Sequence, residues 1–100
     1  MSSAEYRLDI SPAAQRDVID ILRHTGETWG NAQILIYRDK LDAALGRIKK
    51  NPEIGHPSEH LPKTHQLYLA GSHVIIYRVD GPVIGVVRIL HQRMNWIKHL

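Results

Sequence analysis

The strongest hydrophobic pattern of the chain lies between His73 and His91, where two runs of β-branched and aliphatic residues flank Asp80-Gly81-Pro82. Such runs on either side of a Gly-Pro sequence predict a β-hairpin. Both runs are too apolar for strands that face water on both sides. We therefore expect central strands of a sheet that is covered on at least one face. The cover must come from the first half of the chain.

The first half begins with a short strand and a helix. Residues 6–10 alternate between apolar and polar types, as a half-buried strand does. Ser11-Pro12 follows, and serine at an N-cap before proline at the first helical position is a strong signal for a helix start. Apolar residues then recur at helical spacing until Gly30, which ends the predicted helix. The members of this stripe are Ala14, Val18, Ile21, Leu22, Thr25 and Trp29.

A second helix is predicted from Asn31, as its N-cap, to Asn51-Pro52, which ends it. Its apolar residues also recur at intervals of three and four. They are Ile34, Tyr37, Leu41, Ala44, Leu45 and Ile48. Because Gly30-Asn31 alone separates the two helices, they must fold back on each other as a hairpin. The joint stripe of this hairpin can cover the sheet.

The remaining segments complete the predicted fold. Residues 51–64 read as a loop, residues 66–70 as a strand, and Gly71-Ser72 as a turn into the central hairpin. Residues 92–100 fit a short helix or an edge strand. The expected fold class is therefore α+β, with an N-terminal strand and an α-helical hairpin packed on a mainly antiparallel β-sheet. We expect a single domain over residues 1–100.

Composition excludes several classes of protein. The 100 residues are 43% hydrophobic, which suits one small core. The sequence has no cysteine, so disulfides, thiolate metal sites and cysteine nucleophiles are excluded. No apolar run reaches the length of a signal peptide or a membrane span, and we expect a soluble protein that is not exported and binds no membrane.

Charge is distributed unevenly along the chain. Residues 63–100 carry five Lys or Arg and one acidic residue, whereas residues 1–62 carry eight basic and nine acidic residues. A basic C-terminal third favours an acidic partner, either protein or nucleic acid. An ordinary solvated sheet edge would show the same pattern.

No metal or nucleophile motif accompanies this charge. The histidines at positions 56, 60 and 65 have spacings that need a defined loop to converge and lack a carboxylate or thiolate partner set, so we expect neither a metal site nor a cofactor. No serine lies in a nucleophile-elbow sequence. An acid and base pair for RNA cleavage could come from Arg78, Arg88, His91 and Arg93, although exposed basic positions on a sheet explain each of them equally well.

Several segments, in this order and at this spacing, resemble the ParE family of plasmid and chromosomal toxins. They are Trp29-Gly30, Ala32-Gln33, Tyr37, Leu41, Ala44-Leu45, residues 51–55 (NPEIG), residues 72–78 (SHVIIYR), residues 88–94 (RILHQRM) and His99-Leu100. The resemblance runs from about Tyr6 to the C-terminus. It implies the RelE/ParE-like fold, which agrees with the elements predicted above.

The resemblance also implies a function. ParE toxins poison DNA gyrase and so block replication, and a ParD-type antitoxin holds each toxin inactive in a hetero-oligomeric complex. The resemblance thus implies an inhibitor and not an enzyme, located in the bacterial cytoplasm and involved in plasmid stabilisation. It implies no sequence-specific DNA binding by the toxin itself. The antitoxin's C-terminal segment would fold on apolar grooves beside the helical hairpin. A non-toxic binding module on the same scaffold remains an alternative.

The related RelE toxins share the fold but cleave messenger RNA on the ribosome, which gives a second alternative. RelE-like ribonucleases have an arginine within the third strand and often a tyrosine in the C-terminal segment. Here Val74 occupies the strand position, and no tyrosine follows Tyr77. Charge stabilisation at the scissile phosphate would then be missing, although Arg88 could partly substitute for it.

Two surfaces follow as predictions. The basic C-terminal end, with its apolar tail, is the candidate gyrase-binding surface, because Trp and Arg often anchor protein interfaces. Its residues are Arg88, His91, Arg93, Met94, Trp96 and Lys98. The candidate antitoxin-binding residues are Val18, Leu22, Tyr37 and Leu41. Trp96 could instead pack on the sheet.

Overall fold

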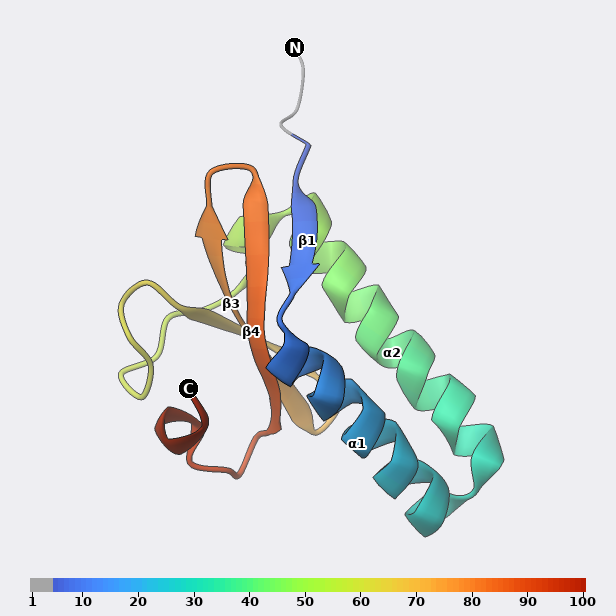
Figure 1. The fold of residues 1–100 in the computed structure, drawn as a ribbon. Helices are drawn as coiled ribbons and strands as arrows, with labels where there is room; N and C mark the ends of the chain where they lie inside the picture. Colours follow the sequence, from blue (N-terminus) through green and yellow to red (C-terminus); the bar gives the residue numbers. More distant parts are fainter. Residues whose placement is uncertain (1–4) are drawn as a thin grey trace.

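A computed structural model describes residues 5–100, which form a layer of two helices against a four-stranded sheet (Figure 1). The α+β class and the N-terminal strand are as predicted. In chain order the elements are β1 (Arg7–Ile10), α1 (Pro12–Trp29), α2 (Asn31–Lys50), the 3-10 helix η1 (Pro52–Ile54), β2 (Gln66–Ala70), β3 (His73–Asp80), β4 (Val83–His91) and the 3-10 helix η2 (Trp96–His99).

The sheet has the strand order β1-β4-β3-β2, so the predicted hairpin supplies its two central strands. Gly81, with φ of +59°, makes the tight turn between β3 and β4. Strand β3 pairs antiparallel with both β2 and β4. Strand β1 lies parallel to β4, from Arg7 opposite Val83 to Ile10 opposite Val86. The sheet is thus mainly antiparallel with one parallel edge.

The main core lies between the sheet and the helical hairpin. The stripe of α2 supplies most of its helical side, and β3 and β4 supply the other side with alternate residues. The buried members are Ala14, Leu41, Ala44, Leu45, Ile48, Ala70, Ile75, Tyr77, Ile84, Val86 and Ile89. Within residues 5–100, no helix is both long enough and apolar enough to cross a membrane.

Two predictions about the helical hairpin were wrong in detail. Gly30, with φ of +95°, is the N-cap of α2, and Asn31 is already its first residue. Trp29, predicted in the apolar stripe, is 73% exposed. The hairpin projects beyond the sheet at this end, so the last turn of α1 has no strand beneath it (Figure 1).

The second face of the sheet carries a smaller core. Its buried residues are Leu61, Val74, Ile76 and Leu90, and Leu67, Val87 and Trp96 pack partly buried against them. The segment predicted as a plain loop covers part of this face and contains η1 and a bridge between His56 and Leu67. The C-terminal residues cover another part. Trp96 thus packs on the sheet, which was one of the two positions predicted for it.

The start of α1 forms hydrogen bonds with the part of the β4 edge that lies beyond the end of β1. Ser11 is the N-cap, as predicted, and its hydroxyl accepts from the backbone N–H of Ala14 at 3.0 Å. The same hydroxyl donates to the carbonyl of Val87 at 2.8 Å, and the Ser11 N–H donates to the carbonyl of Val86 at 3.0 Å. Ser11 therefore caps α1 and also satisfies two carbonyl groups at the edge of β4.

A β-bulge interrupts β4 at Val87. Ile76 pairs with Arg88 and Tyr77 pairs with Val86, which leaves Val87 as the extra residue. A bulge bends its strand and redirects the side chains that follow. Here the next side chain, Arg88, reaches Asp17 on α1.

Candidate functional site

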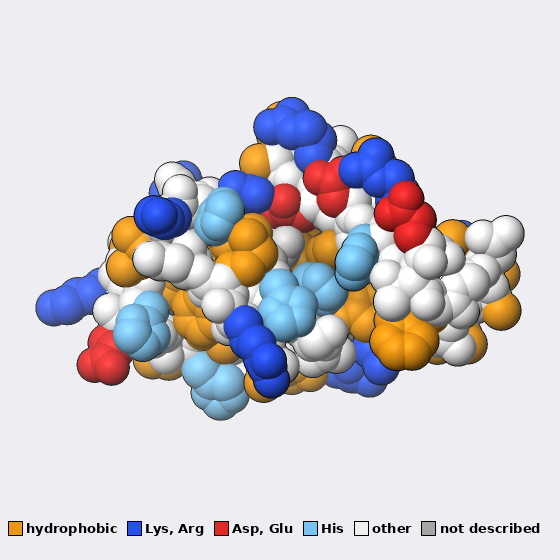
Figure 2. Space-filling view, turned by 90° about the horizontal axis from the view of Figure 1, so that it is seen from below, with side chains coloured by type: hydrophobic (Ala, Val, Ile, Leu, Met, Phe, Trp, Pro, Cys, Tyr) orange, Lys and Arg blue, Asp and Glu red, His pale blue; other side chains and the backbone are white. Residues whose placement is uncertain are grey.

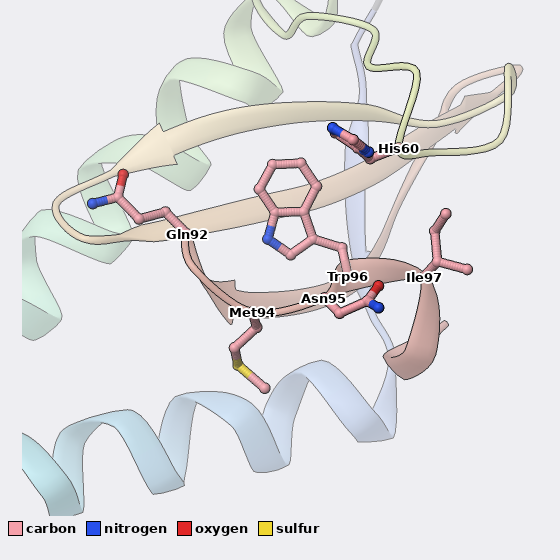
Figure 3. Close-up of a pocket in the computed structure, with 6 residues that line it drawn as sticks. All are labelled: His60, Gln92, Met94, Asn95, Trp96 and Ile97. Atoms are coloured by element: carbon pink, nitrogen blue, oxygen red, sulfur yellow. The ribbon is translucent and has the colours of Figure 1, made fainter.

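The C-terminal segment, residues 92–100, lies across the end of the sheet and turns back in η2. Trp96 points from it toward the strands (Figure 3), and the indole Nε1 donates to the carbonyl of His91 at 3.3 Å. The ring meets His60 edge-on, with 6.2 Å between centroids. Trp96 thus anchors the segment to the second face of the sheet.

Other side chains of the segment are free to meet a partner. Met94, Ile97 and Leu100 are 40%, 60% and 43% exposed, and Arg93 and Lys98 are exposed as well. A cavity of about 500 Å³ opens between them and the covering loop (Figure 3). It is lined by His60, Gln92, Met94, Asn95, Trp96 and Ile97. Exposed apolar groups beside two cations suit an acidic protein surface.

Arg88 differs from the exposed basic residue that was predicted. Its Nε and Nη2 donate to the two carboxylate oxygens of Asp17, each at 2.7 Å, and Nη1 donates to the carbonyl of His99 at 2.6 Å. The ion pair is mostly buried, with 21% and 11% of the side chains exposed. The hydrogen bonds to Asp17 raise the pKa of Arg88 above its ordinary value. Three of the five guanidinium N–H groups are therefore bonded within the chain.

Histidine side chains gather near the middle of the face seen from below (Figure 2). The rings of His73 and His91 meet edge-on, with 5.4 Å between centroids. Nδ1 of His73 lies 2.5 Å from the hydroxyl of Tyr37. These residues and His24 line a groove of about 500 Å³ beside Trp29.

Electrostatics keep His73 uncharged at neutral pH. Burial lowers its pKa to about 4, with further lowering from His91 and His24 and an opposing effect of Asp17. Nδ1 of His91 accepts from the N–H of Arg93 at 3.2 Å, which leaves the proton of a neutral ring on Nε2. In the described part of the chain, no Lys or Arg side chain lines this groove, so it offers no fixed cation to a phosphate. Among residues 5–100, no group of three or more His, Asp or Glu could hold a metal ion.

Comparison with known proteins decides the family. A sequence model described as the ParE toxin of the type II toxin-antitoxin system parDE matches residues 8–96. This chain belongs to the ParE toxin family. It is 38% identical to Toxin ParE1 of Caulobacter vibrioides over 95 residues, which cover 95% of this chain and 96% of that protein. It is 39% identical to Toxin ParE1 of Mycobacterium tuberculosis over 99 residues, covering 98% and 99% of the two chains.

Solved structures show the same fold at lower identity. The chromosomal ParDE toxin-antitoxin system of P. aeruginosa matches with a TM-score of 0.79 and 20% identity, over 89% of this chain and 98% of that chain. The toxin-antitoxin complex RelBE2 of Mycobacterium tuberculosis matches with a TM-score of 0.59 and 18% identity, over 88% and 99%. The fold is thus common to the ParE and RelE branches, and the predicted RelE/ParE-like architecture is confirmed.

The residues predicted as antitoxin contacts of this ParE toxin lie at different depths. Leu41 is 2% exposed and belongs to the main core, so it offers no surface to a partner. Val18, Leu22 and Tyr37 are partly buried. Tyr37 also holds the β2–β3 turn, because its hydroxyl accepts from the N–H of Ser72 and donates to the carbonyl of Ala70, both at 3.2 Å.

Arg88, in the candidate gyrase-binding surface, has two partners that sequence reasoning missed. Asp17 is one of several charged residues beside the apolar stripe of α1, and His99 contributes only a backbone carbonyl to Arg88. The one local signal for Asp17 was its place next to Val18 at the border of the stripe. Of the other predicted residues, His91 and Trp96 are partly buried, and Arg93, Met94 and Lys98 are exposed.

Proposed function

We propose that this ParE toxin inhibits DNA gyrase, traps it with cleaved DNA and so blocks replication in the bacterial cytoplasm. The observation that carries the proposal is membership of the family over residues 8–96. The exposed cations and apolar side chains of residues 92–100 support a protein target of acidic character. Arg93, Met94 and Lys98 are the proposed contacts, and Trp96 supports them from beneath.

The arrangement of the site favours gyrase inhibition over cleavage of messenger RNA. Val74, at the strand position where RelE-like ribonucleases have an arginine, is 1% exposed beneath the second face. Arg88 uses three of its five N–H donors on Asp17 and His99, so the guanidinium is held within the chain at both of its edges. These two features argue against the ribonuclease alternative, because position 74 has no cation and Arg88 is held by contacts within the chain, where neither suits charge stabilisation at a phosphate.

A cleavage assay with purified gyrase, supercoiled plasmid and ATP tests the proposal. We expect cleaved DNA to accumulate with the wild-type toxin and to fall about tenfold when Arg93 and Lys98 are both changed to Glu. The matched control is the same change at Lys49 and Lys50, an exposed basic pair at the end of α2. Its cleavage should equal that of the wild type.

Other outcomes would contradict the proposal. Unaffected gyrase together with ribosome-dependent cleavage of messenger RNA would favour a ribonuclease. Expression without growth arrest, in cells that lack any antitoxin, would favour a passive binding module.

We also propose that a ParD-type antitoxin neutralises this chain by covering the helical hairpin in a hetero-oligomer. Large apolar side chains are exposed there, which is typical of a surface that a partner covers. They are Ile19, Trp29, Leu35 and Ile36, at 63%, 73%, 55% and 54% exposure. Val18, Leu22 and Tyr37 lie partly buried on the same hairpin and would line its grooves.

A binding assay with a co-expressed antitoxin tests this surface. Changing Leu35 and Ile36 to Glu should weaken antitoxin binding by at least about 2 kcal/mol, because both apolar side chains would be replaced by charges in the interface. Gyrase poisoning should stay unchanged. Equal antitoxin affinity for the wild type and this variant would place the antitoxin elsewhere.

A further inference from the structure

The C-terminal segment is fixed to the rest of the chain at few points. The N–H of Gln92 donates to the carbonyl of Ser72 at 3.0 Å, and the carbonyl of His91 accepts from the N–H of Met94 at 3.0 Å and from Trp96 at 3.3 Å. The last turn, η2, has exposed side chains at Ile97 and Lys98. Besides the packing of Trp96 on the sheet, its tie to the body of the protein is the hydrogen bond from Arg88 to the carbonyl of His99.

Arg88 can hold the carbonyl of His99 because Asp17 fixes the position of the guanidinium. One edge of the guanidinium, Nε and Nη2, meets Asp17 in a bidentate pair, and this leaves Nη1 to reach His99. Asp17 is itself oriented, since its Oδ2 also accepts from the backbone N–H of Ile89 at 3.0 Å. A charged pair with this geometry and burial is stronger than an exposed ion pair.

The pair also joins elements that are far apart in sequence. Asp17 lies in the second turn of α1, Arg88 follows the bulge of β4, and His99 is the next-to-last residue. A lysine at position 88 could not replace the arginine, because an ammonium has no planar fork to bind a carboxylate with one edge and a carbonyl with another.

We propose that Asp17 and Arg88 form a clasp that holds the C-terminal segment in place. Arg88 is then a positioning residue for the target-binding surface and makes no contact with the target. The part of this inference that concerns gyrase rests on the function proposed above. The docking of the segment is a property of the free protein and is measured separately.

Fluorescence of Trp96 reports the docking directly. In a Trp29→Phe background Trp96 is the sole tryptophan, and Trp29 is exposed and outside both cores. We expect Arg88→Lys and Asp17→Asn to raise the acrylamide quenching constant of Trp96 about threefold, because the released segment exposes the indole. Carboxypeptidase should also remove Leu100 and His99 faster from both variants.

The matched control is the ion pair of Arg23 and Asp20 on the same helix, 2.8 Å long but 66% and 64% exposed. Arg23→Lys and Asp20→Asn should leave quenching and carboxypeptidase rates at wild-type values. Far-UV circular dichroism and a cooperative urea transition establish that each variant is folded. Unchanged quenching in folded Arg88→Lys and Asp17→Asn would overturn the clasp.

Gyrase cleavage then tests the positioning role. We expect the two clasp variants to lose about tenfold in potency, in parallel with release of the segment, while antitoxin binding is retained. Full potency with a released segment would overturn the positioning role. A wild-type protein that leaves gyrase untouched would refute the proposed function, and the quenching result would still decide whether the clasp exists.

Discussion

At the scale of single residues, the hydroxyl of Tyr77 joins the main core to the loop after α2. The side chain is fully buried, and its hydroxyl donates to the carbonyl of Pro52 at 2.7 Å and accepts from the N–H of Gly55 at 2.8 Å. Burial raises the pKa of this phenol, with an opposing effect of the Gly55 hydrogen bond. It therefore stays protonated and able to donate.

Removing this hydroxyl tests its contribution to stability. Tyr77→Phe should lower the free energy of unfolding by about 1–3 kcal/mol, because a buried carbonyl and a partly buried N–H lose their partner. Urea denaturation measures the change. The control, Tyr68→Phe on β2, removes a hydroxyl from a partly buried ring and should cost under about 0.5 kcal/mol. Equal losses in the two variants would contradict the prediction.

His73 makes the stability depend on pH. Its pKa of about 4 in the folded protein lies below the ordinary value of 6.5, so the unfolded chain binds a proton first as the pH falls. The stabilisation is complete above pH 6.5 and is lost progressively toward pH 4. Because solvent screens part of the effect at this half-buried ring, we expect about 1–2 kcal/mol.

Urea denaturation at pH 7.5 and at pH 4.5 checks this effect. The wild type should lose more stability over that interval than His73→Gln, which has no proton to bind at this position. The titration of other groups is common to both proteins and cancels in the difference. Parallel pH profiles of the two proteins would show that His73 contributes nothing.

At the scale of elements, two glycines in neighbouring elements have opposite roles. Gly46 lies in the interior of α2, where an added Cβ would meet no atom within 4 Å. Gly55 follows η1, and a Cβ there would lie 2.2 Å from the hydroxyl oxygen of Tyr77. The helix therefore has room for a side chain, whereas the loop fits the core only because it lacks one.

Alanine at each position gives opposite expected results. Gly46→Ala should raise the free energy of unfolding by about 0.5–1 kcal/mol, because alanine loses less backbone entropy in a helix. Gly55→Ala should lower it by at least about 2 kcal/mol, since the loop or Tyr77 must move. Thermal or urea unfolding measures both. A stabilised Gly55→Ala variant would mean that the loop can shift freely.

At the scale of the whole molecule, the sheet is covered on both faces by different parts of the chain. The helical hairpin covers one face, and the segment after α2 covers the other together with the C-terminal residues (Figure 1). The C-terminal segment is therefore both part of the second core and the proposed target-binding surface. Its complete deletion would change stability and function together.

Point substitutions separate the two roles. Trp96→Ala should cost about 2 kcal/mol of stability, because it empties a partly buried site against Val74 and Leu90. Ile97→Ala, at a side chain that is 60% exposed, should cost under about 0.5 kcal/mol. Urea denaturation measures both. Equal losses would show that Trp96 is not an anchor.

Much of the fold was determined by local sequence. The Ser11-Pro12 helix start, the helical stripe of α2 and the turn at Gly81 are read from neighbours in the chain, and the structure contains all three. The order and spacing of short motifs also indicated the family, because a resemblance of this kind needs no coordinates. Backbone dihedral preferences and periodic burial depend on residues that are close together in the chain, so both can be predicted from the sequence.

Contacts between distant residues were decided only by the tertiary structure. The parallel pairing of β1 with β4, the bulge at Val87 and the reach of Arg88 to Asp17, 71 residues away, leave no local pattern. The same holds for the site: Arg88 is paired within the chain and is not simply exposed, and the structure decides between the two positions predicted for Trp96, on the surface or packed on the sheet. A side chain's direction and partners depend on how the elements pack, which periodicity alone does not specify.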